Sequence, residues 1–168
     1  MAFFGASAAR DPRTSPKSLS RLARSSNPRV TEAVAGNPST PASTLTALSA
    51  SDERRTLMAL AGNPSTPPEV LDGLVNSKGA SHEVRVAVAG NPGASSETLA
   101  KTLGPYSHGT SHAADDIRRA LAGNPASPAR IRAWLFQLDD LRDVVTRTEP
   151  TESVEARVEL AINAGPDR

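Results

Sequence analysis

The sequence predicts an all-α protein, a right-handed solenoid of about four to five pairs of short helices. The string Ala-Gly-Asn-Pro recurs, apolar residues precede it at helical spacing, and a proline followed by paired leucines comes after it. Such self-similarity is typical of stacked repeats, in which each unit packs only on its neighbours. The four copies of the string occupy residues 35–38, 61–64, 89–92 and 122–125.

The Asn of each string serves as position 0 for comparing the units, and we call the string with the residues that follow it a corner. Successive corner Asn residues lie 26, 28 and 33 residues apart, and a weaker copy at Asn163 follows 39 residues later. A weaker leading copy places Asp11 26 residues before Asn37. The lengthening toward the C-terminus predicts insertions between the two helices of a unit.

The residues before each corner predict a helix that runs into the Asn-Pro pair. Position −2 is always Ala, position −4 is Ala in four of the five copies, and Val30, Val84 and Ile117 stand at position −7. Positions −7, −4 and −3 share one helical face, so this face is the expected core. The branched apolar residues at position −3 are Val34, Leu60, Val88, Leu121 and Leu160.

Each corner contains signals that end one helix and begin another. Gly at position −1 predicts a left-handed helix end, and the Pro after the Asn cannot continue the helix. Thr40-Pro41, Thr66-Pro67 and Ser127-Pro128 predict an N-cap with Pro in the first turn. A second helix then carries Leu45 and Leu48, Leu71 and Leu74, or Leu99 and Leu103.

The string Val-Arg-Val-Ala-Val-Ala-Gly-Asn-Pro at 84–92 resembles the leucine-rich repeat variant family. It recurs with changes at 56–64 and 117–125, so the resemblance covers residues 11–125 and, more loosely, the chain up to residue 165. The resemblance implies a solenoid of short alternating helices, similar in kind to HEAT repeats, and implies no particular function. One architecture of the family adds an iron–sulfur cluster held by cysteines. This chain has no cysteine, so no cofactor is implied.

The predicted organisation is a single repeat domain over residues 1–168. Residues 1–36 form a basic N-terminal capping repeat, and residues 37–123 form three Asn-Pro repeats. Residues 124–168 form a longer C-terminal capping repeat whose apolar helix spans 128–146. Hydrophobic residues make up 38% and aromatic residues only 3% of the chain, so Ala, Leu and Val must supply the core.

Composition and motifs argue against several classes of function. Without cysteine there is no disulfide or thiolate site, and no apolar run is long enough to cross a bilayer. The N-terminus lacks a basic segment followed by a long apolar run, so we expect a cytoplasmic protein. Neither a Gly-x-Ser-x-Gly elbow, a phosphate loop nor a His-Glu-x-x-His helix is present. We therefore expect no enzyme, no metal site and no small-molecule substrate.

Two sets of recurring polar residues are expected to be structural. The corner residues Asn37, Asn63, Asn91 and Asn124 recur too regularly for catalysis, and we expect them to brace the turn backbone of their own or the next unit. Arg85, Arg118 and Arg157 share position −6 and follow acidic residues. They are expected to form an Arg–carboxylate ladder between units. The alternative is an arginine row presented to phosphates.

Charge is divided unevenly along the chain. Residues 1–31 hold six basic residues against Asp11, a net of +5, and residues 139–167 hold eight acids against three arginines, a net of −5. Lys17, Arg21 and Arg24 follow helical spacing, and Arg29 comes shortly after. This N-terminal stripe could be a solvated cap, a contact for nucleic-acid phosphates, or one end of a head-to-tail assembly.

Two further features suggest partner contacts. The insertion 104–112 holds Tyr106, His108 and His112, and it is either a mobile loop or a partner-contacting one. His108 and His112 have the spacing of a helical zinc pair, but Gly109 between them argues against a helix. Trp134 and Phe136 lie in the last predicted helix and form either a closing cap or an exposed docking patch.

We therefore expect a non-enzymatic scaffold or adaptor that binds an unidentified protein partner or assembles with itself. The first alternative is a nucleic-acid-associated protein that contacts phosphates through the basic N-terminal face. The second alternative is an accessory subunit of an enzyme or of a large particle.

Overall fold

The computed structural model describes residues 2–77, 80–104 and 111–137, and this part of the chain forms ten helices and no strand. The odd-numbered helices are α1 (Ala2–Arg10), α3 (Pro28–Gly36), α5 (Arg54–Gly62), α7 (His82–Ala89) and α9 (His112–Ala122). The even-numbered helices are α2 (Pro16–Leu22), α4 (Ala42–Leu48), α6 (Pro68–Asn76), α8 (Ser96–Leu103) and α10 (Ala129–Phe136). Among the described residues, no helix has the length and apolar character that crossing a bilayer requires.

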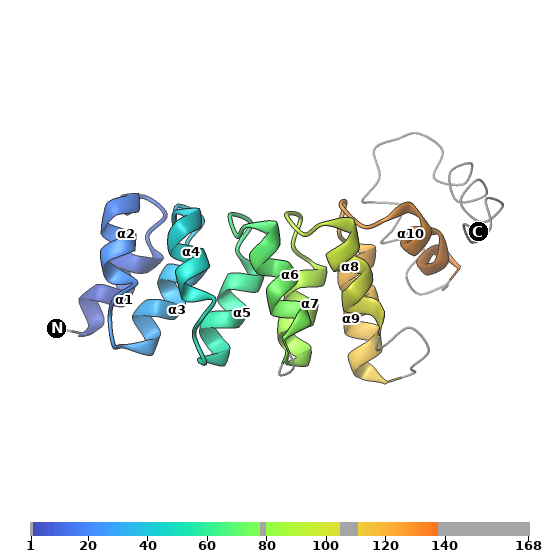
Figure 1. The fold of residues 1–168 in the computed structure, drawn as a ribbon, viewed down its shortest axis with the longest axis horizontal. Coiled ribbons are helices and arrows are strands. Elements are labelled where there is room, and N and C mark those ends of the chain that lie inside the picture. The colour runs from blue at the N-terminus through green and yellow to red at the C-terminus, as the bar shows by residue number, and fades with distance from the viewer. Residues whose placement is uncertain (1, 78–79, 105–110, 138–168) are drawn as a thin grey trace.

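The helices are stacked side by side along one axis, with α1 and α10 at opposite ends (Figure 1). Each odd-numbered helix packs against the next odd-numbered one, from α1 through α9. The even-numbered helices pack against this row from α2 to α10, each beside the odd-numbered helix that follows or precedes it. The main contacts are therefore made between helices that are one or two places apart along the chain.

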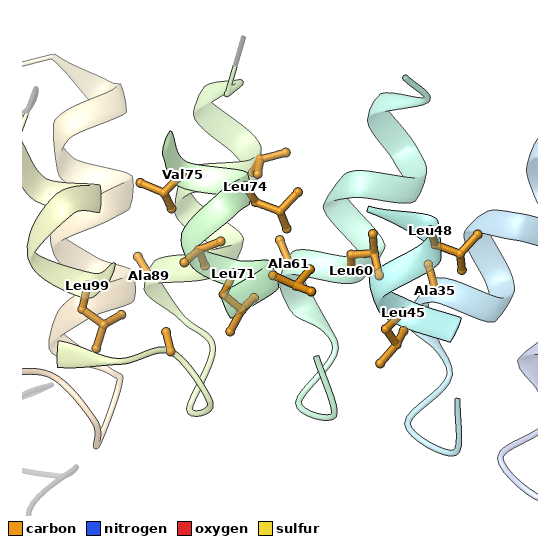
Figure 2. Close-up of a cluster of buried hydrophobic side chains, with 14 of the residues drawn as sticks. Ala35, Leu45, Leu48, Leu60, Ala61, Leu71, Leu74, Val75, Ala89 and Leu99 are labelled. Atoms are coloured by element: carbon orange, nitrogen blue, oxygen red, sulfur yellow. The ribbon is translucent and has the colours of Figure 1, made fainter. Parts of the chain in front are cut away.

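The hydrophobic core is a continuous band of small side chains between the helices (Figure 2). Residues at positions −3 and −2 of α3, α5, α7 and α9 have no exposed surface, as Leu60 and Ala61 illustrate. Position −4 was expected to share this core, but only Ala33 is buried there and its counterparts Ala59 and Ala87 lie half-exposed at the margin. The even-numbered helices contribute Leu45, Leu48, Leu71, Leu74 and Leu99.

All corners have the same length, and the four corner Asn residues make the same hydrogen bonds. The second helix begins five residues after position 0 in each unit, as between Asn37 and Ala42 or Asn63 and Pro68. The Asn63 side-chain amide donates to the carbonyls of Ala35 and Asn37, at 2.7 and 2.9 Å. Its Oδ1 accepts the backbone N–H two residues later, as in an Asx turn.

The same three bonds recur along the stack. The amide nitrogens of Asn37, Asn91 and Asn124 each donate to two carbonyls of the preceding corner, at 2.7–3.0 Å. All four corner Asn residues are 1–2% exposed. The leading corner carries Asp11 instead, whose Oδ1 accepts the Arg13 N–H and whose carbonyl accepts from Asn37. Both of these bonds use oxygen acceptors, so an Asp can make them without a side-chain N–H.

The first helix of a unit does not end in a left-handed glycine, contrary to our expectation. Gly36 and Gly62 lie inside α3 and α5, and Gly90 is a C-cap with φ −85° and ψ −8°. Where the helix reaches position 0, the Asn is extended, with φ −81° and ψ 121° at Asn37. Proline disfavours the helical conformation in the residue before it, so the Asn-Pro pair ends these helices.

The hydroxyl before the second proline caps the preceding helix and not the following one. The expected N-cap bonds are absent at α4, α6 and α10. Thr40, Thr66 and Ser127 instead turn back and donate to the carbonyls of position −3, at 2.6–2.7 Å. These hydroxyls are buried, and each is a second donor to a helix-end carbonyl that also accepts the backbone N–H of position 0.

The expected place of the extra residues was also wrong. They do not fall between the helices of one unit, because the corners are constant; they fall in α6, in α9 and in the connection between α8 and α9. Of the helix expected over 128–146, residues 138–146 lie outside the described residues, and α10 ends at Phe136.

Replacing a corner Asn should destabilise the stack strongly. Asn63→Ala removes both inter-corner bonds, and the Ala35 carbonyl loses its donor while the Asn37 carbonyl keeps the Thr40 N–H. We therefore expect a loss of about 2–4 kcal/mol in the free energy of unfolding. Asn63→Asp should cost at least as much, because a carboxylate oxygen would face those carbonyls. Urea denaturation measures both. Asn76→Ala, at an exposed amide that makes one surface bond, is the control with an expected loss below about 1 kcal/mol; equal losses at the two sites would contradict the bracing role.

Replacing a position −1 glycine should stabilise the fold. Gly62 lies in a helix and a Cβ there would meet nothing within 4 Å. Gly62→Ala therefore reduces the entropy of the unfolded chain without strain, and we expect a gain of about 0.4–1 kcal/mol in thermal or urea unfolding. Ala61→Gly, the reverse change one residue earlier, should destabilise. A loss of stability in Gly62→Ala would show that the glycine is needed for the backbone.

Candidate functional site

Two open hollows lie side by side on α1, α3 and α5, and they share Arg10 and Glu32. The larger, about 480 Å³, is called the basic hollow, and its lining comprises Ala6, Ser7, Arg10, Asn27, Arg29, Glu32 and Arg55. The smaller, about 250 Å³, is lined by Arg10, Glu32, Ala33, Gly36, Asn37, Pro38 and Ala59. We call these two adjacent hollows together the depression, and its lining residues lie on or flank the first three odd-numbered helices.

The arginines of the basic hollow come from, or lie on, three successive odd-numbered helices, α1, α3 and α5. Arg10 ends α1, while Arg29 and Arg55 both stand at position −8, near the start of α3 and α5. All three side chains are exposed, and within the described residues none of them forms an ion pair. With the half-buried Glu32 as the one acid, the charged lining residues sum to +2, three arginines minus one carboxylate.

We call the exposed side of the odd-numbered helices, at positions −8, −5, −4 and −1, the odd-helix face. Its floor carries few long side chains, because position −4 is Ala and position −1 is Gly in each of α3, α5, α7 and α9. The position −1 glycines are all exposed. At Gly36, Gly62 and Gly90 the nearest atoms would leave room for a Cβ. Neither the backbone conformation nor the internal packing therefore accounts for glycine at these three.

Ion pairs between units connect positions −9 and −8. Arg54 contacts Glu83 of the next unit at 2.9 Å, and His82 contacts Asp116 of the next unit at 3.3 Å. Hydrogen bonds from its own backbone N–H and from Ser81, with the charge of Arg54, hold the pKa of Glu83 below its ordinary value. The Arg54–Glu83 pair is exposed and so contributes little to stability. His82 is half-buried, and its contact with the exposed Asp116 is an ion pair only when the imidazole is protonated.

The arginines of position −6 are arranged differently from the expected ladder. Arg118 donates to Asp115 of its own helix at 3.2 Å, and its guanidinium lies 5.4 Å from the centroid of the Trp134 ring. Arg85 is half-buried and makes no ion pair with another described residue. Arg157 lies outside the described residues. The acid Glu83, which precedes Arg85, pairs with Arg54 instead.

A second inter-unit contact centres on Asp72 of α6. Its carboxylate accepts from Lys101 Nζ at 2.7 Å and from Thr98 Oγ1 at 3.1 Å, both on α8, and from Asn76 Nδ2 at 2.7 Å. Hydrogen bonding by Lys101 above all, with that of Thr98 and Asn76, lowers the pKa of Asp72. Hydrogen bonds to Asp72 and Glu97 raise the pKa of Lys101.

The predicted N-terminal stripe is divided between two sides of the stack. Lys17 and Arg21 lie on α2, Arg24 follows that helix, and all three are exposed without lining either hollow. Arg29 is the one member that lines the basic hollow. Its companions Arg10 and Arg55 were not predicted as site residues. The shared position −8 of Arg29 and Arg55 was the available signal.

The remaining predicted site residues lie toward the other end. Tyr106 and His108 are outside the described residues, and His112 is an exposed residue at the start of α9. Among the described residues, no group of three His, Cys, Asp or Glu side chains is placed to hold a metal ion. Trp134 and Phe136 of α10 are half-buried and pack against the core. That packing fits a closing cap, although both keep exposed surface.

No model of a protein family matches this sequence, and no curated protein or solved structure matches it either.

Loss of the Asp72 carboxylate should destabilise the chain in a pH-dependent way. Because the pKa of Asp72 is lowered in the folded state, its contribution is present above the ordinary value of 3.8 and is lost as the pH falls through the folded value. Asp72→Asn should therefore unfold at lower urea than the parent at pH of about 7, and the difference should shrink below pH of about 3.5.

Asp52→Asn, at an exposed acid in the connection between α4 and α5, is the control and should show no such difference. A gap between Asp72→Asn and the parent that stays constant down to low pH would contradict the ion-pair interpretation.

Proposed function

We propose that the chain is a cytoplasmic, non-enzymatic scaffold that binds another protein through the odd-helix face. The proposal includes the finer architecture, a right-handed solenoid of about four to five helix-pair repeats of the leucine-rich repeat variant type. The recurring corners and the packing of each helix on its neighbours support that architecture. Stacked repeats of this kind offer extended binding surfaces.

The observation that carries the proposal is the depression across α1, α3 and α5. Three exposed guanidinium groups gather at one end of it, and none of them pairs with another described residue. Guanidinium groups bind carboxylates in a planar, bidentate geometry and are enriched at protein interfaces. The neighbouring floor of Ala33, Gly36 and Ala59 lets a partner's backbone approach closely.

A second candidate is nucleic-acid binding, which the exposed Lys17, Arg21, Arg24 and Arg29 favour. Phosphate contacts alone would carry it, because no aromatic side chain that the structure describes lines the hollows for base stacking. Filter binding of an oligonucleotide separates the two candidates. Phosphate binding should weaken steeply as salt rises, whereas docking of a protein should change far less.

Site-specific photo-crosslinking tests the proposed surface. A photoreactive residue at Gly62 would sit on the odd-helix face, where nothing crowds a side chain. In the cells that produce the chain, we expect it to form polypeptide adducts that mass spectrometry identifies. The same residue at the exposed Glu69 of α6, outside the odd-helix face, is the control and should form few. Equal adducts from both sites, or none from Gly62, would contradict a protein-binding role for this face.

A further inference from the structure

We propose that the basic hollow binds the acidic C-terminal segment, residues 139–167, of a second copy of the chain. The inference rests on the proposed scaffold function and names its partner. It predicts a head-to-tail assembly, in which the α1 end of one copy receives the C-terminal segment of the next.

The hollow has charge without a partner. Arg10, Arg29 and Arg55 converge from three helices and make no ion pair within the described part of the chain. Its volume of about 480 Å³ falls in the range of pockets that enclose ligands. A segment that bears carboxylates would supply negatively charged partners for these three arginines.

The charge at position −8 of the odd-helix face also changes sign along the stack. Position −8 is Arg29 in α3 and Arg55 in α5, but Glu83 in α7 and Asp116 in α9. The cationic members are free of ion pairs within the described residues, whereas both acids are paired. At position −8, the exposed positive charge therefore lies at the α1 end.

The occupant follows from complementary charge of both signs. Residues 139–167 contain eight acids and three arginines, and the hollow presents three arginines and Glu32. The arginines of the segment can offset Glu32, which a phosphate backbone, being anionic throughout, cannot do. This mixture favours the polypeptide segment over nucleic acid.

The geometry favours a neighbouring copy as the source. Residue 139 follows α10, which lies at the opposite end of the stack from α1 (Figure 1). To reach its own hollow, the segment would have to run back along the whole stack in extended form. That ordering would cost conformational entropy. A second copy placed end to end brings its hollow next to the segment, and such a heterologous contact need not close.

Sedimentation velocity of the full chain tests the assembly. We expect species larger than the monomer at about 50 mM salt and dissociation at about 500 mM, because screening weakens exposed charge contacts. The hollow variant Arg10→Glu/Arg29→Glu/Arg55→Glu should weaken self-association by about tenfold or more. Lys17→Glu/Arg21→Glu/Arg24→Glu makes the same change of net charge on the α2 side and should associate like the parent.

Mixing two charge-reversed chains is the decisive measurement. The segment variant Glu149→Lys/Glu152→Lys/Glu155→Lys/Glu159→Lys should be as poorly associated as the hollow variant. Mixed together, the two should associate again, because the reversed segment of one fits the reversed hollow of the other. Circular dichroism confirms that both variants are folded.

Several outcomes would overturn the proposal. They are a monomer at every salt concentration, equal losses in the hollow variant and the α2 variant, failure of the mixture to associate, and self-association that nuclease treatment abolishes. Crosslinks from Gly62 to other polypeptides, together with a chain that stays monomeric, would leave the scaffold function standing and exclude this occupant alone.

Discussion

The two hydrogen bonds that each corner Asn donates to the corner before it are the constraint on which the stack depends. One side-chain amide, as at Asn63, fixes both the distance and the orientation between successive units. Once the corners are aligned, the odd-numbered helices must lie side by side with positions −3 and −2 between them. Alanine at position −2 then permits close packing, so a core with few aromatic side chains is sufficient.

The constancy of the corners explains where the chain varies. Helix lengths and inter-unit connections change along the stack, while the five residues from each Asn to the next helix do not. The polar contacts outside the corners are also local variants: Arg54–Glu83 joins the first helices of the Asn63 and Asn91 units, and Asp72–Lys101 joins the second helices of the same two units. The surface residues can therefore differ between units while the corners stay the same. This allows a basic depression at one end of an otherwise repetitive face.

Much of the fold could be predicted from the sequence, because its signals are local and repeated. The helix pairs follow from apolar spacing and from the Asn-Pro pair, which acts on adjacent residues. The direction of the Thr40 hydroxyl could not be predicted, since an N-cap and a backward bond to Val34 require the same residue at the same place. The basic hollow could not be predicted from the sequence for a different reason. Arg10 and Arg55 are 45 positions apart, and only the stacking of α1, α3 and α5 brings them to one depression.

The corner bonds also bear on how such a chain can change in evolution. The corner Asn residues from Asn37 to Asn124 donate their amide hydrogens to the preceding unit, and the corners from Asp11 to Asn91 accept them with their carbonyls. An in-frame duplication or deletion of one whole unit joins the same donors to the same acceptors. The length of the array is thus open to genetic copying, whereas a partial unit would separate a buried amide from its acceptors and be removed by selection for folding.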